Sequence, residues 1–310
     1  MITEKDMYFH APASDIHYWA ETNYFGFYIP EEAIHVNVYV LTRQNAGVVL
    51  SSITVTDGFS NTPHLVKYHN NQVHLPFPDS EFDNYKLANG LAIKCTKPVM
   101  NYDIKFDDQR GQSFDLQYEA LMEPYDIHDP DQDPLATSAD DEISNNAYAG
   151  HWDQSGRVTG KFTMGGKTYD VDCVSSMDHS WGERKEEFFQ HFCWLNANFA
   201  NDVSIHCLWS LNPDDNSEYS GILHGYIREG DQAYGLTKGS GKLRRHGLLH
   251  QFLDLEVEDK RGKVHNFTGT AVTSNPWAPW PFVYSIQSLV RWDLDGVIGW
   301  GEIQDASGIN

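Results

Sequence analysis

The sequence predicts an all-β protein made of two packed, barrel-like halves. Long helical periodicity is nearly absent from its 310 residues. Short segments that alternate between polar and apolar residues, or that are rich in β-branched residues, recur along the chain. Brief polar turns separate these segments, and this combination is typical of β-sandwiches and β-barrels.

The first 120 residues contain strand-like segments with turn residues between them. Residues 33–41, 47–56 and 91–95 alternate or are rich in Val, Ile and Thr, as strands are. Asp, Asn and Gly favour tight turns, and they gather at 56–58, 88–90 and 107–111. We therefore expect strands rather than helices in this part of the chain.

Residues 123–146 differ from their surroundings because they are rich in Pro, Asp and Glu. Such a segment buries too little apolar surface to fold on its own, so we expect a long acidic loop. Two roles stay open for it. Long loops inside compact proteins are often functional lids, but a mobile surface loop fits the composition equally well.

Strand-like segments resume after this loop. They are residues 157–162, 167–174, 192–199, 203–211, 221–228, 253–258 and 264–272. Turns that contain glycine, at 164–166 and 229–231, favour antiparallel hairpins. Residues 275–282 read Asn-Pro-Trp-Ala-Pro-Trp-Pro-Phe, and we expect an aromatic loop that lines a pocket mouth or plugs the end of a barrel.

The composition argues against several classes of protein. With 22 basic and 44 acidic residues, the formal net charge is −22, and such a surface repels nucleic acid and anionic lipid. No apolar run approaches the roughly 18 residues of a membrane-spanning helix. The N-terminus lacks a secretion signal, so we expect a cytoplasmic location. We further expect a monomer or homodimer without nucleic-acid or integral membrane partners.

The four cysteines and 15 histidines form no recognisable cofactor site. The cysteines lack Cys-x-x-Cys spacing and are expected to be reduced thiols, with a Cys193–Cys207 disulfide as the less favoured alternative. The pairs His246/His250 and His64/His69 have no neighbouring Glu or His that would complete a metal site. No dinucleotide or phosphate-binding motif occurs, so we expect no metal and no cofactor.

The densest chemistry lies at the junction of the two predicted halves, in residues 177–184. Asp178, His179, Trp181, Glu183 and Arg184 combine two acids, an imidazole, an indole and a guanidinium. Surface turns rarely hold Trp, and core strands rarely hold so much charge. A polar network inside a cavity would bury the tryptophan and also give the charged groups their partners, so we expect a functional site here.

Strand geometry divides this motif between two faces. If the segment is extended, His179, Trp181 and Glu183 point to one side, whereas Asp178 points to the other. Only a bend, for example at Gly182, would bring Asp178 and His179 to one ligand. Two groupings therefore stay open: His179 with Glu183, or Asp178 acting alone.

Other aromatic and polar residues are candidates for substrate binding. Trp194 and Asn196 share one face of the strand 192–199, and His151 and Trp152 belong to a compact cluster at 150–154. The whole set of expected substrate contacts is Trp181, Arg184, Trp194, His151, Trp152, Asn196 and Trp280. Structural roles compete with this reading: Trp194 as a core residue, a simple Glu183–Arg184 ion pair, and His151 as a turn cap.

The order of residues 174–182 and then 191–199 resembles the carotenoid-hydratase-like family, whose members have tandem lipocalin-like domains. The family's first domain ends in a stretch like Trp-Met-Asp-His-Glu-Trp, and this chain has Ser176 and Ser180 where the first Trp and the Glu stand. A bacterial branch with the motif Asp-His-Ser-Trp-Gly-x-Arg is more similar still, and Asp178 to Arg184 match it throughout.

The resemblance implies two lipocalin-like antiparallel β-barrel or sandwich domains packed together, at residues 1–185 and 186–310. The family includes hydratases of isoprenoid double bonds and cyclases, some of them Diels–Alder catalysts. We therefore expect a cofactor-independent acid/base enzyme that acts on an apolar, terpenoid- or steroid-like molecule. It would add or remove water at a double bond, or isomerise or cyclise the substrate.

The expected mechanism needs a carboxylic acid that stays protonated, which burial makes possible. Asp178 is the first choice for this acid and Glu183 the second, with His179 orienting the acid or handling water. Two alternatives stay open: a carrier that binds hydrophobic ligands without catalysis, and a pericyclic cyclase whose pocket shape does most of the work.

Overall fold

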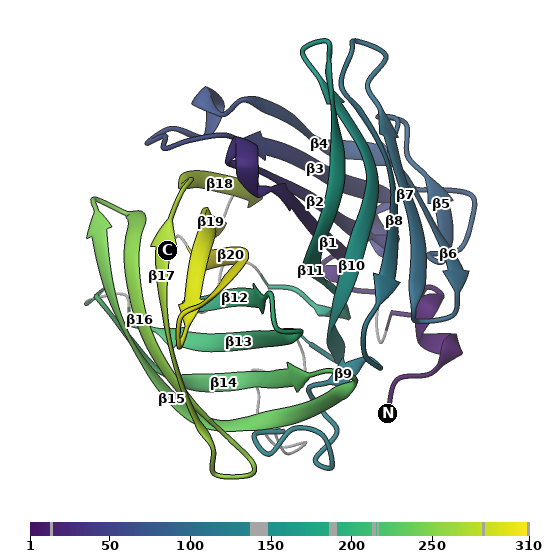
Figure 1. The fold of residues 1–310 in the computed structure, drawn as a ribbon. Coiled ribbons are helices and arrows are strands. Elements are labelled where there is room, and N and C mark those ends of the chain that lie inside the picture. Colours follow the sequence, from purple (N-terminus) through teal and green to yellow (C-terminus); the bar gives the residue numbers. More distant parts are fainter. Residues whose placement is uncertain are drawn as a thin grey trace.

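The computed structural model describes residues 1–12, 15–136, 148–185, 191–212, 215, 217–280 and 283–308, without the side chains of 279 and 280. Two antiparallel sheets make up the fold (Figure 1). Among the described residues no α-helix occurs, and no helix is long and apolar enough to cross a membrane. In the described ranges, four short 3-10 helices occupy Glu4–Met7, Pro30–Glu32, Gln44–Ala46 and Pro63–Leu65.

The first sheet curls into a half-barrel with the strand order β4-β3-β2-β1-β11-β10-β8-β7-β6-β5, and β9 pairs with β10. Its strands are β1 (Trp19–Ile29), β2 (Ile34–Arg43), β3 (Val48–Thr56), β4 (Tyr68–Pro76), β5 (Asn84–Lys86), β6 (Ala92–Lys97), β7 (Asn101–Asp107), β8 (Ser113–Ala120), β9 (Tyr125–Asp126), β10 (Gly150–Met164) and β11 (Lys167–Glu183). The long central strand β11 carries residues 177–183 of the junction motif and pairs with the equally central β10.

The second sheet closes into a barrel because β17 pairs with β19 as well as with β16. Its strands are β12 (Phe192–Phe199), β13 (Val203–Leu211), β14 (Glu218–Glu229), β15 (Gln232–His246), β16 (Leu249–Asp259), β17 (Val264–Ala271), β18 (Asn275–Trp280), β19 (Val283–Leu294) and β20 (Val297–Gly308). β18 adds to the edge of β19 outside the closed ring.

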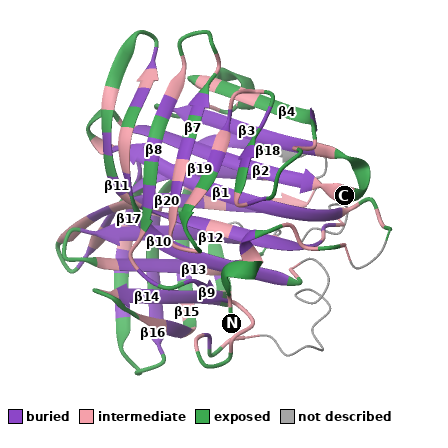
Figure 2. Cartoon of the chain, turned by 90° about the vertical axis from the view of Figure 1, so that its right-hand side faces the viewer, coloured by how far each residue is buried: buried purple, intermediate pink, exposed green. Residues whose placement is uncertain are grey.

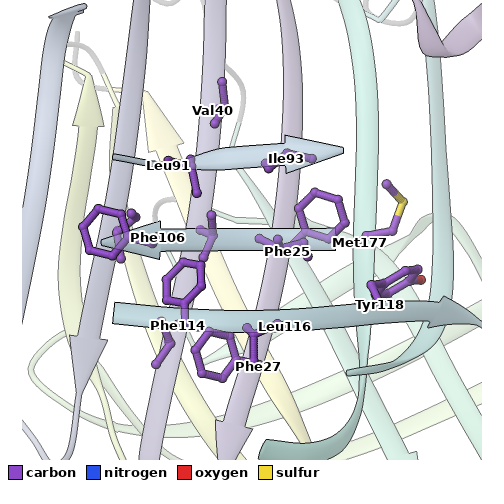
Figure 3. Close-up of a cluster of buried hydrophobic side chains, with 14 of the residues drawn as sticks. Phe25, Phe27, Val40, Leu91, Ile93, Phe106, Phe114, Leu116, Tyr118 and Met177 are labelled. Atoms are coloured by element: carbon purple, nitrogen blue, oxygen red, sulfur yellow. The ribbon is translucent and has the colours of Figure 1, made fainter. Parts of the chain in front are cut away.

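Each sheet encloses its own hydrophobic core. The half-barrel is filled by aromatic and branched side chains, among them Phe25, Phe27, Phe106 and Phe114 (Figure 3). The closed barrel holds a separate cluster that includes Trp209 and Trp292. A chain of 310 residues is near the upper size for a single hydrophobic core, and here the apolar residues are divided between two cores.

A third cluster lies between the two sheets, where the outer face of the half-barrel packs on the outer face of the barrel. It contains Ala20, Tyr24, Tyr39, Leu41, Leu50, Trp194 and Trp277. Side chains alternate along β1, so Phe25 and Phe27 point into the half-barrel while Tyr24 points to the partner sheet. Buried residues therefore continue through the middle of both sheets, and exposed residues gather toward the hairpin ends (Figure 2).

The all-β fold class is confirmed, and β12 and β13 begin and end where the sequence predicts. Two local expectations are wrong. Residues 150–154 form the start of β10 rather than a cluster before it, and residues 275–280 form a strand rather than a loop. Pro276 fits this strand because β18 is an edge strand, which needs fewer backbone donors. All four cysteines are free thiols.

The expected acidic loop is in part ordered structure. Residues 125 and 126 form β9 against β10, and Asp133 is buried. Residues 137–146 lie outside the described part of the chain. The first sheet ends at Glu183 and the second begins at Phe192. The division into folding units at 185 stays a prediction.

Candidate functional site

Two carboxyl groups lie side by side on the face of the half-barrel that meets the barrel. Asp153 of β10 and Asp178 of β11 are direct cross-strand partners, and Asp178 is also the partner of Tyr24 in β1. Because cross-strand partners point to the same face, both carboxyls face the interface. This pair is the centre of the candidate site.

Asp153 is fully buried and is contacted by four side chains, three from strands of the barrel and one from β10 itself. Trp194 Nε1 donates to Asp153 Oδ1 at 3.0 Å, and the Nε2 atoms of His151 and His224 lie 2.8 and 3.1 Å from Oδ2. His206 Nε2 is 3.2 Å from the same oxygen. Burial opposes ionisation, but His206 and His151 outweigh it and hold the pKa of Asp153 well below its usual range.

His224 connects this network to the acidic segment after β9. Its Nδ1 contacts Oδ2 of the buried Asp133, while its Nε2 contacts Asp153. Burial lowers the pKa of His224, but the hydrogen bonds to Asp133 and Asp153 prevail and raise it to about 9. His224 is therefore a cation held between two carboxylates at neutral pH.

Asp178 has the opposite electrostatic character. Among the described residues, no hydrogen-bond donor contacts its carboxyl group, and Asp178 as a whole residue is of intermediate exposure. Burial raises the pKa of Asp178 to about 7; the charges of His151 and Arg184 oppose this shift, and the neighbouring Asp153 carboxylate adds to it. Two adjacent carboxyls thus have pKa values that are pushed apart, one ionised and one readily protonated at neutral pH.

Arg184 lies on the same side of β11. Its Nη2 donates to Ser180 Oγ at 2.7 Å, and its guanidinium stacks on the ring of Tyr148 at 3.9 Å. The Nε of Arg184 and the Nδ1 of His151 are buried without a hydrogen-bond partner. The site thus contains a protonatable acid, an imidazole with a free nitrogen and a guanidinium with spare donors.

His179 points to the opposite face, into the half-barrel, as the alternation predicts. Its Nε2 lies 2.8 Å from Glu21 Oε1, and His10 Nδ1 lies 2.8 Å from the same oxygen. Burial lowers the pKa of His179, and Glu21 opposes this shift. Gly182 has a φ of 155° and stays paired with Ala20 in the regular ladder between β1 and β11, so the strand does not bend there and His179 stays on the face opposite Asp178.

The expected grouping of His179 with Glu183 is not found. Glu183 contacts Lys185 at 3.9 Å at the end of β11, with its side chain 21% exposed. The buried carboxylate beside His179 is Glu21, which the sequence does not single out because it lies 158 residues away. Trp181 stacks on His10 and Trp152 packs against His179, so both tryptophans belong to the half-barrel interior.

The other expected contacts divide in a simple way. His151, Arg184, Trp194 and Asn196 lie at the interface between the sheets. The side chain of Trp280 lies outside the described part of the chain. Of the expected set, therefore, Asp178 and these four side chains lie at the interface between the two sheets.

A second buried carboxylate, Glu302 of β20, ties the sheets together farther along the interface. Its Oε2 accepts from Tyr24 Oη at 2.5 Å and lies 2.6 Å from His35 Nε2, while Oε1 accepts from Asn196 Nδ2 at 3.1 Å. Gly26 leaves room for it, since a Cβ at that position would lie 2.6 Å from Oε1. These bonds fix the two sheets relative to each other.

Several of these residues could not be chosen from the sequence. Asp133, Asp153, His206, His224, Glu21 and Glu302 act through partners that are distant along the chain. One local signal did exist. Asp153 stands in the polar-aromatic cluster 150–154, two residues from His151, so a strand over that cluster would have placed both on one face.

Within the described part of the chain, two groups have the composition of a divalent metal site: His10, Glu21 and His179, and Asp153, His206 and His224. Within each group the potential ligand atoms lie within 4.8 Å of one another. In the first, Glu21 bonds to both histidines. In the second, Asp153 bonds to His224, and only His206 lacks a hydrogen bond among these six residues. In both groups, therefore, most of the side chains already have hydrogen-bond partners within the group.

Solved structures with the same fold cover nearly the whole chain at low sequence identity. A Nitrosomonas europaea protein assigned as AttH superposes with a TM-score of 0.62 and 11% identity, over 96% of this chain and 95% of that one. Kievitone hydratase from Nectria haematococca gives 0.58 and 11%, over 99% and 93%. CghA gives 0.60 and 11%, over 94% and 88%.

No curated protein matches the chain in sequence. A family model matches it from residue 3 to residue 307, which is nearly its full length. The chain therefore belongs to the family described as "Domain of unknown function (DUF7064)".

Proposed function

We propose that this protein is an acid/base enzyme that acts, without a cofactor, on an apolar terpenoid- or steroid-like molecule held between the two sheets. The reaction adds or removes water at a double bond, or isomerises or cyclises the substrate. One observation carries the proposal: the adjacent carboxyls of Asp153 and Asp178 have pKa values shifted in opposite directions. Such a split assigns one carboxyl as the proton donor and the other as a permanent anion.

In this mechanism Asp178 is the general acid. Its O–H bond breaks as the π electrons of the alkene form a new C–H bond, which leaves a cation on the second carbon. A water oxygen bonds to that carbon and loses a proton to His151 Nδ1, the imidazole nitrogen without a partner. Asp153 holds the other ring nitrogen of His151 at 2.8 Å and stabilises the imidazolium that forms. Dehydration is the same sequence in reverse.

The cationic intermediate needs stabilisation until water bonds to it. The aromatic faces of Trp194, Tyr39 and Tyr24 line the interface beside the acid. An aromatic ring stabilises a desolvated cation by about 2 kcal/mol. Kievitone hydratase shares this fold and is by its name a hydratase, which supports hydration among the possible reactions.

The test is transfer of solvent hydrogen to carbon. The purified protein is incubated in D2O with a panel of unsaturated terpenoids and steroids, and products are analysed by mass spectrometry. We expect a product that carries one deuterium on carbon, with Asp178→Asn slower by about 10²-fold or more. Glu183→Gln, which alters the second-choice acid at the strand end, should retain near wild-type turnover.

Other results would assign the alternatives. A bound molecule that is released unchanged, with no deuterium uptake in any case, indicates the hydrophobic-ligand carrier. A rearranged product without deuterium, formed equally well by Asp178→Asn, indicates the pericyclic cyclase. Either outcome rules out the general-acid mechanism.

A further inference from the structure

Arg184 is a buried cation without a carboxylate partner among the described residues. The residue is 5% exposed, yet no Asp or Glu oxygen of the described chain lies within 4 Å of its guanidinium. The other two buried guanidinium groups each have one: Arg228 bonds to Asp202 at 2.8 Å and Arg245 to Asp305 at 2.5 Å. A buried charge normally requires such compensation.

The contacts of Arg184 leave much of its hydrogen-bonding capacity unused. One Nη2 bond goes to Ser180 Oγ, which is itself 2.7 Å from Thr22 Oγ1, and the flat face rests on Tyr148. Nε is buried and has no acceptor. A guanidinium has five N–H donors in a rigid fork that matches a carboxylate. The missing partner is therefore an acceptor group with negative charge.

The position of Arg184 links it to the proposed acid. Ser180, which holds the guanidinium, is two residues from Asp178 on the same face of β11, a separation of about 7 Å along a strand. The apolar cluster that contains Ala20, Leu41 and Tyr39 lies on that face as well. An anion at Arg184 thus leaves the rest of a ligand among apolar side chains, with its nearest carbons close to Asp178.

We propose that Arg184 and Ser180 bind the carboxylate of an otherwise apolar, unsaturated acid. This inference rests on the proposed function and narrows its substrate class to apolar carboxylic acids whose double bond lies a few carbon atoms from the carboxylate. A single guanidinium matches one carboxylate in a two-bond arrangement. The overall charge of −22 gives the surface no general attraction for anions, so the selectivity is local.

Equilibrium binding tests this without turnover. Three acids whose first double bond lies next to the carboxylate are compared with their own methyl esters by fluorescence or calorimetry: retinoic acid, farnesoic acid and geranic acid. At least one acid should bind about tenfold or more tightly than its ester to the wild type. Arg184→Gln should lose this preference and still bind the ester, and Arg184→Lys should keep part of it. Arg157→Gln, which alters an exposed arginine paired with Asp172, should behave as wild type.

The outcomes are separable from those of the acid mechanism. Esters that bind the wild type as tightly as the acids, no binding of any acid, or a preference that persists in Arg184→Gln overturns the carboxylate site. Preference for inorganic phosphate or a phosphate ester over the acids would also overturn it. If Arg184→Gln does not fold, the acid-to-ester ratio of the wild type decides. A preference that holds while no deuterium reaches carbon refutes only the acid mechanism.

Discussion

At the scale of single residues, Asp178 and Asp153 show how the environment gives one residue type two states. Both are aspartates on neighbouring strands that face the same interface. Asp153 accepts bonds from an indole and two imidazoles, whereas Asp178 accepts none among the described residues. Desolvation raises the pKa of both carboxyls. At Asp153 the surrounding partners outweigh it and lower the pKa, whereas at Asp178 desolvation prevails and the pKa rises.

The raised pKa of Asp178 makes stability depend on pH in a definite direction. Its folded-state pKa of about 7 exceeds the ordinary value of 3.8, so its contribution to stability is full below pH 4 and is lost as pH rises through 7. Asp178→Asn cannot ionise. The wild type should therefore lose stability between pH 4 and 7 while Asp178→Asn does not. Over this range the free energy of unfolding of the variant, relative to that of wild type, should rise by up to about 4 kcal/mol.

Urea denaturation at several pH values measures this difference. The exposed Asp170, also on β11, provides the control: Asp170→Asn removes a carboxylate from the solvent-exposed beginning of the same strand. A difference between wild type and Asp178→Asn that stays constant from pH 4 to 8 would show that Asp178 titrates normally.

At the scale of elements, the segment after β9 is held to the barrel by Asp133. Its carboxylate contacts His224 of β14, and Pro134 packs beside Gly235 of β15. This contact gives the acidic segment a structural role next to the candidate site. It also extends the Asp153 network across both sheets, since His224 touches both carboxylates.

Asp133→Asn should weaken this docking in a pH-dependent way. The pKa of His224 is raised from 6.5 to about 9, so its contribution to stability is full below pH 6.5 and is lost as pH rises through 9. At pH 6 the variant should lose roughly 3 kcal/mol of unfolding free energy, the scale for breaking a buried ion pair. The loss should shrink above pH 9, and Asp131→Asn, an exposed change in the same segment, should have little effect at either pH.

Strand alternation explains how much of the site could be predicted from the sequence. The two-residue period of β11 places Asp178 and His179 on opposite faces, and Trp194 and Asn196 together, as expected. Pairing partners could not be predicted, because Asp153, His206 and His224 meet only through the packing of β10 against β13 and β14. The strand at 275–280 was missed because its prolines read as a loop, and an edge position tolerates them.

At the scale of the whole molecule, the two sheets are joined by a polar interface as well as an apolar one. Glu302 receives bonds from β1, β2 and β12, which leaves its carboxylate little freedom to move. The backbone of Gly26 packs against this carboxylate. The relative position of the sheets, and with it the shape of the candidate site, depends on this close approach.

Gly26→Ala tests that dependence. The new methyl would lie 2.6 Å from Glu302 Oε1, so the sheets must shift or the carboxylate must lose bonds. We expect a loss of about 1–3 kcal/mol in the free energy of unfolding, as for overpacked sites. Gly58→Ala, whose methyl would meet nothing within 4 Å, is the matched control and should be close to neutral. Equal stability of the two variants would mean that Gly26 is not required for close packing.

The account depends most on a carboxylic acid kept protonated near neutral pH where the two sheets meet. The direct measurement is a carbon-13 NMR titration of the aspartate carboxyl signals between pH 3 and 9, in wild type and in Asp178→Asn. We expect one signal that titrates with a pKa of about 7 and is missing from the variant. A wild-type protein in which every aspartate signal has finished titrating below about pH 5 would contradict the proposed acid.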